Sequence, residues 1–383
     1  MQSKSIKLTF PFSRLSTELA LEIIRFAAAP DLSSSNAVRR PDNPYAIALS
    51  LCLVSRAFRH AVIPELLHTV LLSRSCHVSS FVNALRMQKV HHLNARHLHV
   101  DYTRHVRRIW VDECCAPLVP SLHSHENMPY GSMFHDEQTD STDTLDYTLL
   151  APALLAAPEL AINFSGIHIL YYALESVWFA PSHKPSSLPW RTKSLTLTGD
   201  FWRWRPLTGT AEGTAFLASL SRIVLLIPSI VDMPTSFLPN ELLKMSSSEV
   251  CRIPHWISSV PWHAFAHLEQ VVIPLERCAS VSEYEMKHGH VDVNLLVLTL
   301  PLSCEAGWVQ LVLQNPSVGD AYSRVERISV ALHATKNGCD CGRLFCQECS
   351  SSRVDEQSSA GILQLELHYD WEEVWARTWG LVG

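Results

Sequence analysis

The sequence predicts an α/β protein in which a short helical unit precedes an irregular array of strands that form a parallel sheet. Residues 15–68 contain apolar segments with helical spacing, and short strand-like runs recur from residue 69 onward. The chain has 383 residues, of which 47% are apolar and 18% charged, so it can bury a large core without disulfides. At this length we expect two domains, at residues 11–72 and 73–383.

The helical unit is read from the period of its apolar residues. Between residues 15 and 27 they recur every three or four positions, and Ser16 is placed to cap the helix that this spacing predicts. Residues 45–54 form a second apolar helical segment, and Ser55 is placed to cap a third. Pro64 is expected to begin a further short turn, because proline suits the first position of a helix.

Two runs within this unit closely resemble the F-box. They are Leu-x-x-Glu-Leu-x-x-Glu-Ile-Ile, which starts at Leu15, and Leu-x-Leu-Val-Ser-Arg-x-Phe-Arg, which starts at Leu51. The family usually has Pro after the first Leu and Trp near the end, where this chain has Ser16 and Phe58. Residues 30–44 are also longer than the family's connection between its first two helices. These departures leave the apolar positions of the motif intact.

The F-box resemblance implies docking on the Skp-type adaptor of a cullin–RING ubiquitin ligase. The chain would be the ligase's substrate-recognition subunit: it would also associate with the cullin scaffold and would transfer no ubiquitin itself. Docking would be helix-in-groove recognition, with apolar anchors in pockets of the partner. The alternative is a non-catalytic scaffold whose helices only cap the following domain. The residues at the family's adaptor-binding positions are Leu15, Leu19, Ile23, Ile24, Leu51, Leu53, Val54, Phe58 and Arg59.

The rest of the chain resembles the degenerate leucine-rich-repeat domains that follow F-boxes in many fungal proteins. Several strand-like runs follow a leucine by a few residues, although their spacing is looser than the period of about 20–29 residues of regular leucine-rich repeats. The resemblance implies an irregular solenoid whose parallel sheet offers an open face to a protein target. A compact α/β domain is the alternative. We expect strands at 69–72, 97–100, 176–179, 194–198, 222–227, 270–273, 295–300, 327–331 and 361–368.

Charge is distributed unevenly along the chain. Residues 1–108 contain 15 Lys or Arg and six Asp or Glu, whereas residues 109–183 contain ten acidic residues and no Lys or Arg. Within the second region we expect a long acidic loop near residues 120–148, which has no apolar period. The net charge of −6 argues against nucleic-acid binding, and the aromatic and basic run at 201–205 is too short to reverse that expectation.

Cysteine content and hydropathy suggest where the protein resides. Eleven cysteines without a secretory signal favour a reducing compartment, cytoplasmic or nuclear, and no apolar run is long enough to predict a membrane span.

Four of the cysteines form C-x-C-x4-C-x2-C, and such thiolates suit structural zinc. The spacing differs from the usual pair of separated C-x2-C units, so a metal-free loop is the alternative, and no other cofactor is expected. The candidate ligands are Cys339, Cys341, Cys346 and Cys349.

Two further patterns bear on function. Trp371, Trp375 and Trp379 are four residues apart, which predicts a helix that covers the open edge of the last repeat. The histidines between residues 91 and 105 are more typical of solvated or packed side chains than of a metal site.

Phosphate-binding glycine loops, H-E-x-x-H and G-x-S-x-G do not occur, so we expect a protein that is not an enzyme. An unrecognised enzyme that uses the histidines or cysteines is the remaining hypothesis.

Overall fold

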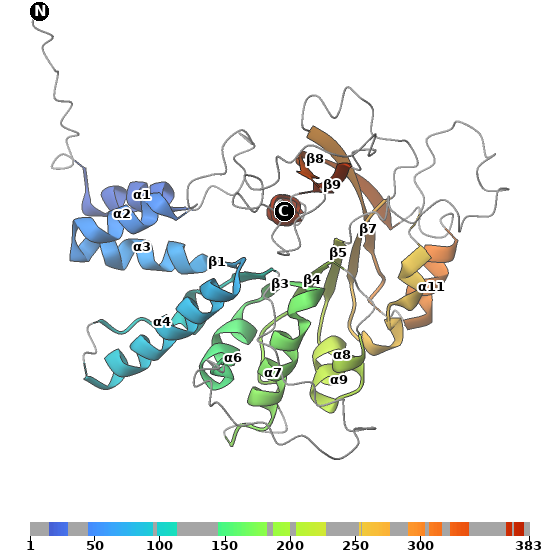
Figure 1. Cartoon of the computed structure of the whole chain (residues 1–383), viewed down its shortest axis with the longest axis horizontal. Coiled ribbons are helices and arrows are strands. Elements are labelled where there is room, and N and C mark those ends of the chain that lie inside the picture. Colours follow the sequence, from blue (N-terminus) through green and yellow to red (C-terminus); the bar gives the residue numbers. More distant parts are fainter. Residues whose placement is uncertain are drawn as a thin grey trace, which may run out of the picture.

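The computed structural model begins with three packed helices (Figure 1). They are α1 (Thr17–Ala28), α2 (Ala46–Val54) and α3 (Arg56–His68), close to the predicted segments. The residues that the structure describes are 15–29, 45–94, 98–112, 145–181, 187–199, 204–226, 253, 255–275, 290–302, 306–315, 322–336, 365–369 and 371–378.

The predicted serine caps are confirmed. Ser16 Oγ accepts a hydrogen bond from the amide of Leu19 at 3.3 Å, and Ser55 Oγ accepts one from the amide of Phe58 at 3.1 Å. These bonds satisfy amide groups that have no partner within the helix itself. The side-chain oxygens therefore fix where α1 and α3 begin.

The prediction that Pro64 begins a new turn is wrong. It lies inside α3, which continues to His68. Val62 and Leu67, on either side of the proline, are buried at 0% and 5% exposure. The burial of these two side chains stabilises α3 as one continuous helix. This stabilisation offsets the loss of the backbone hydrogen bond that proline cannot donate.

Nine strands lie in the sheet in the same order as in the sequence. Strands β1 to β6 pair in parallel, and the pairs from β6 to β9 are antiparallel. Strand β9 pairs with the part of β8 that lies beyond its contact with β7. The strands are β1 (Thr69–Leu72), β2 (Arg108–Val111), β3 (Glu159–Asn163), β4 (Ser194–Thr198), β5 (Arg222–Leu226), β6 (Gln270–Pro274), β7 (His290–Thr299), β8 (Ser323–Lys336) and β9 (Leu365–Tyr369).

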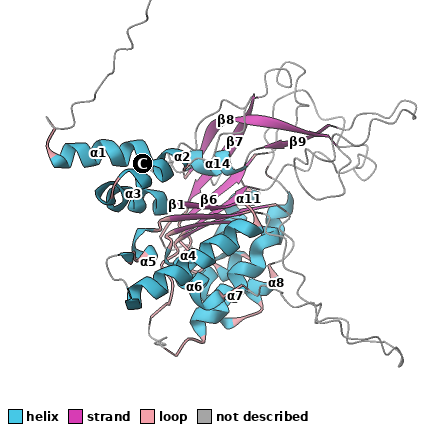
Figure 2. Cartoon of the chain, turned by 60° about the vertical axis from the view of Figure 1, so that its left-hand side comes forward, coloured by secondary structure: helices cyan, strands magenta, loops and turns pink. Residues whose placement is uncertain are grey.

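Helices connect successive strands and pack on one side of the sheet (Figures 1 and 2). Between the parallel strands lie α4 (Ser75–Asn94), α5 (Tyr102–His105), α6 (Tyr147–Ala156), η3 (Phe164–Gly166), α7 (Ile167–Trp178), α8 (Arg205–Thr208), α9 (Ala211–Ala218), η6 (His255–Ser259) and η7 (Trp262–Ala264). Helix α11 (Ala306–Gln314) lies between β7 and β8, and α14 (Trp371–Thr378) follows β9.

Both faces of the parallel strands are buried. On β2, Ile109 and Val111 belong to the large core shared with α4, α6, α7 and α9, whereas Trp110 belongs to a separate core on the opposite face. Alternation of this kind follows from the two-residue period of a strand. We call these two sides the helix-covered face and the second face. The second face carries Trp110, Ala161, Val224 and Val272.

The expected parallel sheet is confirmed for β1 to β6, and its continuation to the end of the chain is wrong. From β6 onward the strands form an antiparallel meander. The runs at 69–72, 194–198, 222–227 and 270–273 match β1, β4, β5 and β6, and those at 295–300 and 327–331 fall largely within β7 and β8. Of the strand predicted at 361–368, the structure describes residues 365–368, and these lie in β9.

The predicted strand at 97–100 is wrong within its described residues, and β2 was missed. Val100 donates its amide to Gln88 Oε1 at 2.7 Å, so this segment is tied to the side of α4 rather than to a strand. Strand β2 forms a few residues later and pairs on both sides with the sheet. A four-residue strand carries too little periodicity to be distinguished from its neighbour by sequence alone.

The predicted strand at 176–179 is also wrong. These residues include the end of α7, and the strand in this part of the chain is β3. Ile167, Leu170 and Leu174 are buried along α7, and Val177 packs beside the same core one turn later. The spacing of three and four residues between them is helical, and this signal in the sequence was available to find the helix.

Gly199 marks the sharp turn at the end of β4. Its φ is 80°, and a Cβ at this position would lie 2.8 Å from Asn163 Oδ1. We expect Gly199→Ala to lower the free energy of unfolding by about 1–2 kcal/mol, because an L side chain is strained in this conformation and meets Asn163. Urea denaturation measures the change.

Gly307 provides the matched control. It lies in α11, and a Cβ there would meet nothing within 4 Å. Gly307→Ala should leave the protein equally stable or stabilise it by up to about 1 kcal/mol. Equal effects of the two substitutions would contradict the assigned conformation of Gly199.

Candidate protein-binding surfaces

Helices α1 to α3 enclose a small core of their own. It is formed by Ile24, Ala28, Ala48 and Val62, with partly buried residues of α2 and α3 around it. A core this small accommodates only one side of each helix. The remaining apolar residues of the three helices therefore lie on the outside.

The structure divides the nine predicted adaptor-binding residues by exposure. Leu19, Ile23, Leu53 and Val54 are exposed at 57%, 44%, 82% and 63%. Because large apolar side chains in these numbers are costly to leave in water, they define a candidate docking surface. Of the other five, Leu15, Leu51 and Phe58 are half-buried, Arg59 is exposed, and Ile24 is buried at 3% exposure.

Two of the predicted residues act within the helical unit. Ile24 belongs to the small core, so its side chain is not offered to a partner. Arg59 Nε donates a hydrogen bond to the carbonyl of Cys52 at 3.2 Å, which binds the last turn of α2 to α3. Burial raises the pKa of the Cys52 thiol, and the charge of Arg59 opposes this shift. Arg59 thus has a structural role whatever else it contacts.

Three exposed apolar residues of this unit were missed by the sequence analysis. Phe26 on α1 is 88% exposed, and Ile47 and Leu49 on α2 are 63% and 46% exposed. Phe26 follows Leu19 and Ile23 at the spacing of successive helical turns, so these three share one side of α1. Helical spacing would have identified Phe26 in the sequence, whereas the outward side of α2 depends on how that helix packs.

The helical unit is attached to the edge of the sheet through Tyr45. Its hydroxyl donates to the carbonyl of Thr69 at 2.7 Å and accepts from the amide of Leu71 at 3.1 Å. Both partners lie on β1, the first strand of the sheet. A single side chain therefore satisfies backbone groups on an edge beside which the described part of the chain places no further strand.

The second face of the sheet is not an open surface at its centre, because α14 lies across it. The rings of Trp375 on α14 and Trp110 on β2 are 5.1 Å apart, and both residues are 2% exposed. At the other end of the helix, the carbonyl of Thr378 accepts a hydrogen bond from Arg222 Nη2 on β5 at 3.5 Å. The expectation that the tryptophan segment covers the edge of the last repeat is therefore wrong: α14 covers a face.

Three buried polar atoms, one on α14 and two on the strands beneath it, lack hydrogen-bond partners among the described residues. They are Nε1 of Trp110, Nε of Arg222 and Nε of Arg377. Burial also lowers the pKa of Arg222. All three atoms are donors, so the contact between α14 and the sheet rests on apolar packing more than on hydrogen bonding.

A hollow of about 520 Å³ lies beside Lys193, His267 and Glu269. Ser219 and Ser221 also line it, but their hydroxyls donate to the carbonyls of Phe216 and Lys193 respectively. In this arrangement neither serine donates to the histidine, as a nucleophile activated by a general base would.

The candidate metal ligands are not tested by the structure. Cys339, Cys341, Cys346 and Cys349 lie outside the described residues, as do residues 120–144 of the predicted acidic loop. Within the described part of the chain, no group of three or more His, Cys, Asp or Glu side chains is arranged to hold a metal. His92 and His99 are in ring contact at 4.7 Å, which fits packed histidines.

Comparison with known proteins adds no family assignment, since no protein-family model and no curated protein matches the chain. Among the helices that the structure describes, none combines the length and the apolar character needed to cross a membrane.

Trp375 should contribute strongly to stability, because it fills the core on the second face. We expect Trp375→Ala to lower the free energy of unfolding by about 3–5 kcal/mol, the range found when a buried aromatic side chain is removed. Urea denaturation followed by circular dichroism measures this loss.

Phe179→Ala is the comparison variant, because Phe179 is 71% exposed. Its stability should change by no more than about 0.5 kcal/mol. If the two variants unfold at the same urea concentration, α14 does not cover the second face in solution.

Proposed function

We propose that this chain is the substrate-recognition subunit of a cullin–RING ubiquitin ligase, which binds a Skp-type adaptor through α1 to α3. The observation that carries the proposal is the exposure of Leu19, Ile23, Leu53 and Val54, four apolar residues at predicted adaptor-binding positions. Because they are offered by short helices, they suit insertion into pockets of a partner. The chain itself would perform no chemistry; it would hold a target near the transfer machinery and so raise the effective concentration of the target's lysines.

The part of the proposal that concerns the target rests on the strand-bearing region. Strands in sequence order with helices on one side are what a degenerate leucine-rich-repeat domain requires. The antiparallel meander and α14 depart from that pattern. Because α14 buries the middle of the second face, the target would bind elsewhere or at the margins of this face. We place the activity in the cytoplasm or nucleus, as the cysteine content of the sequence suggests.

Co-purification with a Skp-type adaptor tests the proposal. Leu19→Asp combined with Val54→Asp places charges at two exposed predicted contacts, so the double variant should fold but lose at least tenfold in adaptor affinity. Pull-down followed by calorimetric titration measures the loss, and circular dichroism checks the fold.

Leu302→Asp serves as the matched control, since Leu302 is 94% exposed and lies outside the helical unit. It should retain the adaptor with unchanged affinity. Failure of the wild-type protein to bind the adaptor at micromolar concentrations would refute the proposal.

A second candidate function is that of a non-catalytic scaffold whose helical unit only caps the sheet. The two hydrogen bonds of Tyr45 to β1 favour this reading, because they protect the edge strand. Under this alternative the full chain would fold and remain monomeric without retaining an adaptor. The adaptor experiment therefore separates the two functions.

We further propose a structural zinc ion at Cys339, Cys341, Cys346 and Cys349, which supply the four thiolates of a tetrahedral site. Freshly reduced protein should contain about one zinc per chain, and Cys339→Ser combined with Cys341→Ser should lose it. Elemental analysis measures the content. Zinc that persists in the double variant, or protein isolated without zinc, would exclude this site.

A further inference from the structure

The outer half of α4 has an exposed face that the proposed function does not use. Met87, Val90 and Leu93 are exposed at 57%, 50% and 73%, and their spacing of three residues places them along one side of the helix. The first half of the helix, by contrast, is buried in the large core through Val78, Phe81 and Val82. In Figure 1 this end of α4 projects away from the sheet.

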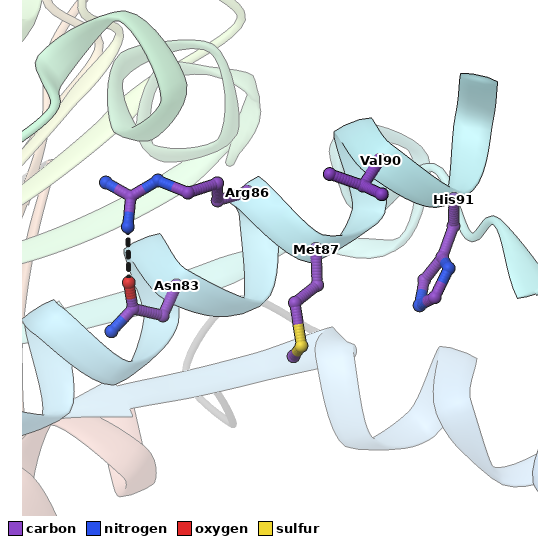
Figure 3. A pocket seen from close by; sticks show the side chains of 5 residues that line it. All are labelled: Asn83, Arg86, Met87, Val90 and His91. Atoms are coloured by element: carbon purple, nitrogen blue, oxygen red, sulfur yellow. Dashed lines mark hydrogen bonds between the residues drawn. The ribbon is translucent and has the colours of Figure 1, made fainter. Parts of the chain in front are cut away.

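This face is hollowed as well as apolar. A hollow of about 390 Å³ is lined by Asn83, Arg86, Met87, Val90 and His91. Figure 3 shows these side chains on successive turns, with Met87 and His91 pointing to the same side and Arg86 turned back toward Asn83. Arg86 Nη1 donates to Asn83 Oδ1 at 2.7 Å, which holds the guanidinium at one end of the hollow.

The charged residues of α4 itself have one sign. Helix α4 contains Arg86 and Lys89 and no Asp or Glu over its full length. Among the described residues, neither of these two cations has a carboxylate within ion-pair distance. The charge of Arg86 contributes to lowering the pKa of Asp146, but the hydrogen bond from Thr148 is the largest cause of that shift. Asp146, at the N-cap of α6, thus offsets part of this charge without forming an ion pair with Arg86, and a ligand could meet the remainder.

We propose that the face formed by Asn83, Arg86, Met87, Val90, His91 and Leu93 binds an acidic amphipathic helix of a partner protein. Leucine or phenylalanine side chains of that helix would enter the hollow beside Met87 and Val90, and its carboxylates would meet Arg86 and Lys89. This is helix-in-groove recognition with charge complementarity at the rim. All five residues that line the hollow lie on α4, so it is an open surface of one helix, along which a second helix can pack. The proposal does not depend on adaptor binding.

A peptide titration tests this surface in the full-length protein. The probe is a fluorescent 20-residue peptide. It has Leu in a repeating i, i+3, i+4, i+7 pattern, which places Leu along one side of a helix, and Glu at most other positions. We expect saturable binding below about 100 µM by fluorescence anisotropy. The same peptide with Lys in place of Glu should bind at least about tenfold more weakly, because it meets like charge.

Two variants locate the binding site, and each has a matched control. Met87→Glu should weaken binding at least about tenfold, and Arg86→Glu about fivefold. Leu302→Glu and Arg191→Glu make the same chemical changes at exposed positions elsewhere and should leave the affinity unchanged. Adaptor binding should be unaffected by Met87→Glu. A loss of peptide binding at α4 can therefore be distinguished from a loss of adaptor binding, on which the proposed function depends.

Four results would overturn the proposal. They are the absence of peptide binding to the wild-type protein, equal binding of the Glu and Lys peptides, equal losses in the control variants, and a wild-type dimer that Met87→Glu dissociates. The last result would assign the face to a second copy of the chain. Binding to vesicles containing phosphatidylserine, lost in Met87→Glu while the peptide does not bind, would assign it to a membrane.

Discussion

A parallel sheet must be covered on both faces, and in this chain the second cover comes from the far end of the sequence. Helices between the strands bury one face, as connections between parallel strands require. The opposite face carries large apolar residues such as Trp110, which would otherwise meet water. Helix α14 covers them through Trp375, whose ring lies 5.1 Å from that of Trp110. The antiparallel strands β7 and β8 extend the same core.

This cover bears on where the protein binds other molecules. A solenoid that recognises a target through its sheet needs that face open, but Trp110, Ala161, Val224 and Val272 are all buried. Most of the large apolar residues that the structure leaves exposed lie instead on α1, α2 and α4, and the others are scattered over later parts of the chain. Two separate surfaces follow from this distribution, one on the three-helix unit and one on α4. They differ in chemistry, because α4 carries Arg86 and Lys89 without acidic residues, whereas α1 carries Glu18 and an ion pair between Glu22 and Arg25.

Much of the fold could be predicted from local signals. The caps at Ser16 and Ser55 and the apolar periods were sufficient to place α1, α2 and the start of α3, and the β-branched runs were sufficient to place β4, β5 and β6. The strands β2 and β3 were missed because such short segments are selected by their neighbours in the sheet rather than by their own composition. For the candidate site, the sequence identified Leu19, Ile23, Leu53 and Val54, but only packing showed that Ile24 faces inward.

The sequence by itself determined where the first helices begin, the division of charge along the chain and the motif that resembles the F-box, because all of these depend on residues close together in the chain. The tertiary structure alone decided which apolar residues remain exposed and which face of the sheet is covered. Those outcomes depend on contacts such as that between Trp110 and Trp375, which are far apart in the sequence and leave no local pattern that would reveal their pairing.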